Sequence, residues 1–207
     1  ELDHDDILTQ ECLSWLAQSF EKYPDAGMCY TDCTEFKEAT GDCVNYGEYA
    51  FGYGGYRTEN YKGRDYLTMN YPRLNQKTIR HIVGVPNHVR CWRSSVYHGV
   101  GGHNPNLHVA DDYDLIVRTF LKSRICHIPK LGYIQYCNSD NSNTTDRRRP
   151  EIQRLVEMIR KNYDEDIHWR LLKLGLPDNV WDAHSKEGDP HRDIPKCDKH
   201  ACIISEV

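Results

Sequence analysis

Glu1-Leu2-Asp3-His4-Asp5-Asp6 is the stretch around which this chain is organised. Three aspartates and an imidazole stand here directly ahead of a segment with helical periodicity. Carboxylates at this spacing repel one another unless a cation or hydrogen-bond donors stabilise their charged forms. Mg²⁺ is usually held by one or two carboxylates, while substrate phosphates and water complete its shell. The stretch therefore predicts a metal and phosphate site. The competing interpretation is an acidic helix N-terminus capped by Asp5 or Asp6.

The bulk composition narrows the class of protein. With 207 residues, the chain is long enough for one domain with a substantial core. A net charge of −5 without a long basic run argues against a nucleic-acid partner, with Arg147-Arg148-Arg149 as a local exception. No window approaches the roughly 18 apolar residues of a membrane span. The nine cysteines are scattered without a CxxC pair, as in proteins with reduced thiols. We therefore expect a soluble, cytoplasmic protein.

The first third of the chain predicts a helix, a strand and a long loop. Apolar residues at helical spacing predict a helix over 7–23, which Pro24 ends. A strand is predicted over 26–33, and a short helix over 62–71. Residues 35–60 lack periodicity and are rich in Gly and Tyr. This composition suits either the lining of a polar-ligand groove or an irregular packed loop.

The rest of the chain alternates strand and helix signals. A strand over 89–92 leads to a short helix that ends at Gly101-Gly102, and the acidic run at Asp111-Asp112 opens another helix. The remaining expected elements are strands over 125–128 and 133–137, helices over 150–163 and 166–174, and a weakly apolar tail over 183–207.

Three motifs in a fixed order give the chain a resemblance to a known family. They are Leu2-Asp3-His4-Asp5-Asp6, then Gly101-Gly102-His103, then Ala110-Asp111-Asp112-Tyr113-Asp114-Leu115. This order resembles a family 2 glycosyltransferase of the GT-A fold. The first motif is similar to that family's DxD motif. The second and third are similar to its Gly-Gly…Glu-Asp-x-x-Leu segment, which carries the catalytic base.

The resemblance implies an α/β protein with the GT-A (Rossmann-like) nucleotide-diphospho-sugar transferase fold, lacking the N-terminal nucleotide-binding strands. Residues 1–165 would be a partial catalytic domain from the DxD motif to the acceptor side, 166–182 a C-terminal helical segment and 183–207 a disordered tail. Because the chain starts with Glu1 directly inside the motif, we expect a fragment. We expect it to bind sugar nucleotide poorly by itself.

The implied reaction is transfer of a sugar, with inversion, from a nucleotide-sugar donor to a saccharide or other hydroxyl acceptor. Mg²⁺ or Mn²⁺ is the implied cofactor, with Asp5 as first ligand, Asp3 near the donor or the metal and Asp6 in reserve. Asp112 aligns with the general base, and Asp111 would orient the acceptor or support the base. An acidic helix cap is the alternative for this second cluster.

Other candidate residues follow from their place around these motifs. Trp92 and Gly102-His103 would line the acceptor side, although Trp92 is equally compatible with the core. The family's Arg and His after the final strands are absent from Tyr133-Ile134-Gln135-Tyr136. Arg147 and Arg148 would supply that positive charge to the donor phosphates, since guanidinium groups suit phosphate oxygens. A solvated helix start is the alternative. Arg80-His81 would approach the phosphates or, more simply, lie at the surface.

Two further classes of function compete with the transferase. One is a non-catalytic carbohydrate-binding or scaffold module derived from the same fold, which the missing Arg and His favour. The other is a metal-dependent phosphohydrolase, which the sequence disfavours because it lacks a dense His/Asp cluster for two metals. The sequence does not specify the donor sugar, the nucleotide or the acceptor.

Overall fold

The protein is described here by a computed structural model. It describes residues 1–46, 55–71, 74, 78–81, 86–137, 144–176 and 178, apart from the side chains of residues 81 and 144–147. Within these ranges the chain forms a mixed α/β structure, as the sequence predicts. None of its described helices is both long and apolar enough to cross a membrane.

A mixed five-stranded sheet forms the centre of the fold. Its long middle strands, β2 (Ala26–Lys37) and β7 (Arg124–Cys137), run parallel to each other. Three short strands pair antiparallel with them: β1 (Ile7–Leu8) with β7, and β3 (Asp42–Cys43) and β6 (Arg90–Trp92) with β2. Residues 26–34 of β2 are all buried. This continuous burial is typical of a parallel strand with a covering layer on each face.

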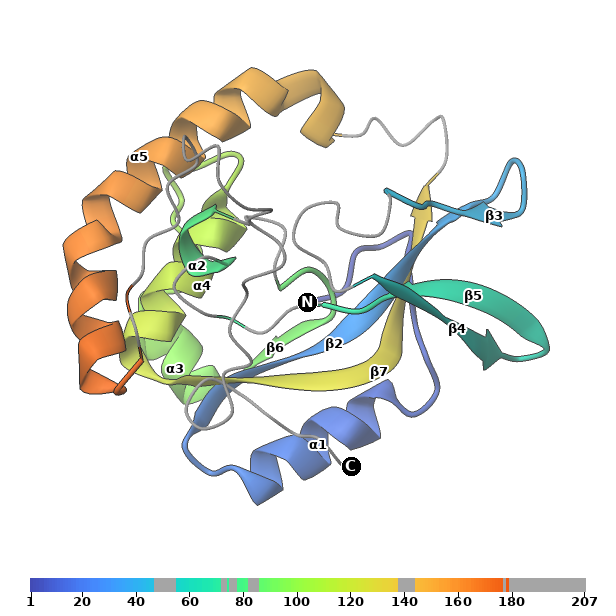
Figure 1. The fold of residues 1–207 in the computed structure, drawn as a ribbon, viewed down its shortest axis with the longest axis horizontal. Coiled ribbons are helices and arrows are strands. Elements are labelled where there is room, and N and C mark those ends of the chain that lie inside the picture. The colour runs from blue at the N-terminus through green and yellow to red at the C-terminus, as the bar shows by residue number, and fades with distance from the viewer. Residues whose placement is uncertain are drawn as a thin grey trace.

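Helices cover both faces of the sheet (Figure 1). On one face lies α1 (Cys12–Lys22), which buries Cys12 and Leu16. On the other lie α3 (Ser94–Gly99), α4 (Asp111–Lys122) and α5 (Thr144–Lys173), together with the short α2 (Thr78–His81). A Cβ at Gly27 would lie 2.1 Å from Ser123 Oγ, so β2 reaches this layer only because residue 27 is glycine.

The segment after the opening acidic stretch differs from its prediction. Ile7 and Leu8 pair with Ile134 and Tyr133 of β7, and α1 begins only at Cys12. The helix predicted from residue 7 is therefore wrong in its first turn, because two apolar residues gain more by joining the sheet edge. Asp5 and Asp6 accordingly do not cap a helix, and the cap interpretation of this stretch is wrong.

Residues 62–71 form a strand instead of the predicted helix. β4 (Tyr56–Tyr61) and β5 (Arg64–Met69) make an antiparallel hairpin at the side of the molecule (Figure 1). Its two-residue turn, Lys62-Gly63, has φ of 52° and 80°. Positive φ at both turn positions matches the right-handed twist of the strands, and glycine accepts it readily. The alternating pattern on both sides of this turn is the signal that a helical interpretation overlooked.

The C-terminal helical region is continuous where two helices were predicted. α5 runs unbroken from Thr144 to Lys173 and contains Pro150 within its first two turns. The boundary expected between residues 165 and 166 falls inside this helix. The strands predicted over 125–128 and 133–137 likewise form the single strand β7. The expected tail over 183–207 lies outside the described residues, as do residues 47–54 of the loop predicted over 35–60. The loop prediction is wrong where residues 35–37, 42–43 and 56–60 belong to β2, β3 and β4.

Candidate functional site

The opening acidic segment is fastened to β7 by Asp6. Tyr133 donates its hydroxyl hydrogen to Asp6 Oδ2 at 2.7 Å, and the Tyr136 N–H donates to Asp6 Oδ1 at 2.8 Å. The Asp3 N–H donates to the same Tyr133 oxygen at 3.2 Å. Burial and the neighbouring carboxylates Asp5 and Asp3 raise the pKa of Asp6, although both hydrogen bonds act against the rise. Both Asp6 oxygens are thus already engaged, and Asp6 anchors the segment.

Asp3 and Asp5 are the other two aspartates of this segment. Their side chains are 52% and 28% exposed, and His4, 3.7 Å from Asp5, is 93% exposed. Among the described residues, no three His, Cys, Asp or Glu side chains converge as a ready-made metal site. Two carboxylate ligands suit Mg²⁺ or Mn²⁺ when phosphate and water oxygens complete the shell. The donor set of Asp3 and Asp5 fits an ion of that kind.

The second acidic cluster opens α4, as predicted. Asp111 and Asp112 are the first two residues of the helix, and Ala110 precedes them with φ of 58°. An alanine in this left-handed region costs about 1–2 kcal/mol. Such backbone strain concentrates at functional sites, where the surrounding structure holds it in place. The helix start is therefore a stiff platform for two adjacent carboxylates.

Arg90 of β6 joins the two acidic clusters. Its side chain is 4% exposed, and it lies 2.8 Å from Asp112 Oδ2 and 2.9 Å from Glu1 Oε2. Burial acts to lower the pKa of Arg90, but the carboxylates of Asp112 and Glu1 outweigh it and raise the pKa. Burial acts to raise the pKa of Glu1, but contact with His88 and the charge of Arg90 lower it to about 2. Glu1 in the opening segment and Asp112 at the start of α4 thus share one buried cation.

His88 completes this junction from the segment before β6. Its Nε2 lies 3.0 Å from Arg90 and 3.8 Å from both Glu1 and Asp3, and its ring stacks on Tyr133 at 5.0 Å. The sequence prediction overlooked both His88 and Arg90. The available signal was a charged residue within a short apolar strand, because an arginine is rarely buried unless it is paired.

The Gly101-Gly102 turn places His103 against Asp111. His103 Nδ1 lies 2.8 Å from Asp111 Oδ2, and the two side chains are 36% and 35% exposed. Gly102 has φ of 64°, and a Cβ there would lie 3.0 Å from the Tyr97 ring. The glycine is therefore required both by the backbone and by the ring that packs on it.

Trp92 faces the core more than the site. Its indole N–H donates to Thr119 Oγ1 of α4 at 2.9 Å, and its ring meets Tyr97 edge-on at 6.4 Å. The side chain is half-buried and packs against the hydrophobic core. Of the two roles predicted for Trp92, the structure supports packing in the core. Its connection to the predicted acceptor side is the edge-on contact with Tyr97.

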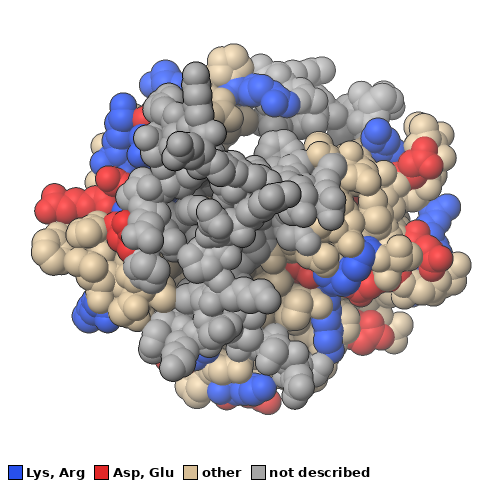
Figure 2. Space-filling view, in the orientation of Figure 1, with Lys and Arg blue, Asp and Glu red and all other residues tan. Residues whose placement is uncertain are grey.

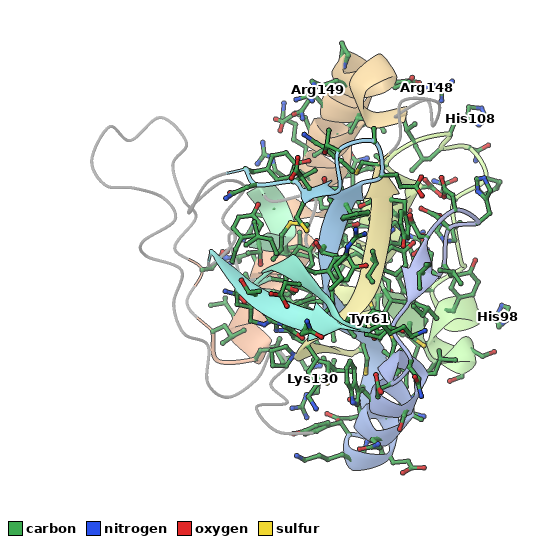
Figure 3. All side chains as sticks on the ribbon, turned by 90° about the vertical axis from the view of Figure 1, so that its right-hand side faces the viewer. Tyr61, His98, His108, Lys130, Arg148 and Arg149 are labelled. Atoms are coloured by element: carbon green, nitrogen blue, oxygen red, sulfur yellow. The ribbon has the colours of Figure 1, made fainter. Side chains whose placement is uncertain are left out.

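The predicted basic residues fall into separate regions. Arg148 is exposed beside Glu151 at 3.7 Å, and the side chain of Arg147 is outside the described residues. Figure 3 places Arg148 and Arg149 at the same end of the molecule as His108, in the loop before α4. Arg80 is 1% exposed, so its predicted surface position is wrong, and the side chain of His81 is not described.

Arg80 instead holds the C-terminal region to α2. Its guanidinium lies 2.7 Å from Asp164 and 2.6 Å from Asp178, and His168 lies 2.5 Å from Asp178. Asp178 is 5% exposed. This second buried arginine thus links α2 to α5 and to Asp178.

Comparison with known proteins adds no assignment. No protein-family model matches this chain, and no curated protein matches its sequence. On the face shown in Figure 2, Lys/Arg and Asp/Glu atoms are interspersed around the rim rather than gathered into one field. The geometry around Arg90 is therefore the main guide to function.

Proposed function

We propose that the protein is a metal-dependent inverting glycosyltransferase, which moves a sugar from a nucleotide-sugar donor to an acceptor hydroxyl. The observation that carries the proposal is the meeting of two distant acidic segments at the buried Arg90. These are the segments whose motifs resemble the DxD and base-carrying segments of a family 2 glycosyltransferase. A mixed sheet with helices on both faces is compatible with the GT-A fold that the resemblance implies.

Asp3 and Asp5 would hold the divalent ion, and Asp6 keeps their segment on β7. When bound, Mg²⁺ or Mn²⁺ supplies Lewis-acid stabilisation of the charge that develops on the leaving diphosphate. Arg148 would add positive charge on the donor side. Asp3 is 52% and Asp5 28% exposed, so neither carboxylate is buried in the sheet.

Asp112 is the general base. Arg90 and the Tyr113 N–H each hold one of its oxygens at 2.8 Å, which fixes the orientation of the carboxylate. The acceptor oxygen bonds to the anomeric carbon while the bond to the diphosphate oxygen breaks and its electron pair leaves with the nucleotide. Asp112 takes the acceptor's proton as the new bond forms. Asp111, His103 and Gly102 form the acceptor side next to it, with Trp92 behind Tyr97.

Replacement of the base tests the proposal. In the natural protein that carries this sequence, Asp112→Asn should lower sugar transfer by about 10²–10⁴-fold, as expected for the loss of a general base. Mn²⁺-dependent binding of the donor should persist, measured by calorimetry. Asp25→Asn is the matched control, since Asp25 is 66% exposed and pairs only with Arg124 in the described chain. Unchanged transfer by Asp112→Asn would remove Asp112 from the mechanism.

A non-catalytic carbohydrate-binding module is the second candidate. It is favoured by the segment over 133–136, which lacks the family's Arg and His and instead uses Tyr133 and the Tyr136 N–H to hold Asp6. Such a module would bind a saccharide without a metal or a sugar nucleotide. Saccharide binding that is unaffected by EDTA, without turnover of any nucleotide sugar, would favour it over the transferase.

A further inference from the structure

We propose that the His103–Asp111 pair binds a second hydroxyl of the acceptor, so that the acceptor is a saccharide with neighbouring hydroxyls rather than a simple alcohol. The inference rests on the proposed function and narrows its substrate class. Its basis is that two groups able to accept hydrogen bonds, the His103 imidazole and the Asp112 carboxylate, are brought to the start of the same helix.

The contact with Asp111 determines which imidazole nitrogen is left for a ligand. His103 Nδ1 lies 2.8 Å from Asp111 Oδ2, so a neutral imidazole carries its hydrogen there. Nε2 then has a lone pair and, within the described part of the chain, no hydrogen-bond partner. The side chain is 36% exposed, which leaves it open to an O–H donor from solvent or substrate.

The loop that carries His103 is fastened to the helix that carries both aspartates. Arg118 of α4 donates to the backbone oxygens of Val100 and Gly102 and pairs with Asp114 at 2.6 Å. The His103 N–H lies 3.4 Å from the Tyr97 hydroxyl oxygen. His103 is therefore positioned relative to α4 by backbone contacts as well as by its own side chain.

The ring of Tyr97 provides an aromatic surface beside the His103–Asp111 pair, as in sites that bind sugars. It lies 5.9 Å from the His103 ring and 6.4 Å from that of Trp92, and it is half-buried. Aromatic rings pack on the C–H face of a sugar while nearby polar groups bind its hydroxyls. A monohydric alcohol would satisfy only one of Asp112 and His103, whereas a saccharide with adjacent hydroxyls can satisfy both.

The experiment measures acceptor kinetics in the natural protein, with Mn²⁺, a panel of uridine and guanosine diphosphate sugars, and methyl glycosides as acceptors. His103→Leu should raise the acceptor KM by about tenfold, the value of one lost hydrogen bond, and change kcat by less than about twofold. The His103→Gln variant keeps an acceptor oxygen and should recover most of the affinity. His98→Leu is the matched control, because His98 also touches Tyr97 but not Asp111.

Mono-deoxy acceptors make the test independent of any variant's folding. The wild type should lose about tenfold in KM when the hydroxyl next to the nucleophile is removed, and His103→Leu should not discriminate. A wild type that accepts n-butanol as well as a glycoside, or a His103→Leu defect confined to kcat, would overturn the inference. Absence of transfer from every donor by the wild type would instead overturn the proposed function, and the inference with it.

Discussion

Two buried arginines in this molecule have nearly the same partners but different surroundings. Arg90 and Arg80 are 4% and 1% exposed, and each pairs with two carboxylates, one of which also contacts a histidine. Around Arg80, these contacts close the junction between α2 and the C-terminal region. Around Arg90, the opening segment brings two further carboxylates: Asp3, which is 52% exposed and lies 3.8 Å from His88, and Asp5, which is 28% exposed. A buried ion pair alone therefore does not mark a functional site. Additional accessible carboxylates beside such a pair are a better indicator of a functional site.

The largest expected effect is the loss of the Arg80 junction. Arg80→Met should lower the free energy of unfolding by about 3–5 kcal/mol, because it leaves the buried Asp178 carboxylate without its cation. Urea denaturation measures the change. The double variant Arg80→Met/Asp178→Asn should regain part of it, since the remaining group is uncharged. A decrease in the free energy of unfolding of less than about 1 kcal/mol would show that the Arg80–Asp178 pair contributes little to stability.

Arg90→Met should lower the free energy of unfolding less than Arg80→Met does, and it should affect the proposed activity more. Arg90→Met leaves Glu1 and Asp112, whose side chains are 26% and 37% exposed and can be solvated. We expect a loss of about 1–3 kcal/mol in the free energy of unfolding. In the proposed transferase, the rate of sugar transfer should also fall, because Asp112 loses the contact that orients its carboxylate. If Arg90→Met destabilised the protein more than Arg80→Met, the contrast between the two junctions would be wrong.

Acid should weaken the contacts around Arg80 by protonating Asp178. Burial acts to raise the pKa of Asp178, but Arg80 and His168 outweigh it and lower the pKa below 3.8. The resulting stabilisation is complete above the unfolded pKa and is lost as pH falls through the lower folded value. Denaturation of the wild type and Asp178→Asn from neutral pH to about pH 2 should show a constant gap that closes only below about pH 3.8.

The smallest effects concern the backbone that holds the acidic helix start. Ala110→Gly should stabilise the protein by up to about 1 kcal/mol, because glycine adopts a φ of 58° without strain. Gly102→Ala should act in the opposite direction, since its Cβ would meet the Tyr97 ring at 3.0 Å. Thermal denaturation compares the pair. Equal shifts of the same sign would contradict the assigned strain.

Local sequence signals predicted those parts of the fold that depend on local interactions. The acidic run at residues 111–112 does open a helix, and the strand before the Gly-Gly turn is present as β6. The separation of Ile7 and Leu8 from α1 could not be predicted from periodicity. Those residues fit a helical stripe equally well, and only pairing with β7 decides between the two structures.

The sequence predicted candidate site residues, but not the contacts that hold them. The motifs identified Asp3, Asp5 and Asp112 by their residue types and order. Arg90 and His88 were not predicted as site residues, because a single sequence does not show that the distant Glu1 compensates the charge of a buried guanidinium. Long-range charge pairing is a property of the folded sheet, and it becomes visible only when the strands are in register.

The parallel pairing of β2 with β7 also determines when the site can exist. Asp32 and His127 on these strands are 95 residues apart, and their side chains meet at 2.7 Å. Sheets that depend on such distant pairings fold slowly, in about milliseconds to seconds, because a large loop must close first. Tyr133 and the Tyr136 N–H, which fasten Asp6, belong to the later strand. The acidic segment is therefore fixed in place only once β7 has joined the sheet.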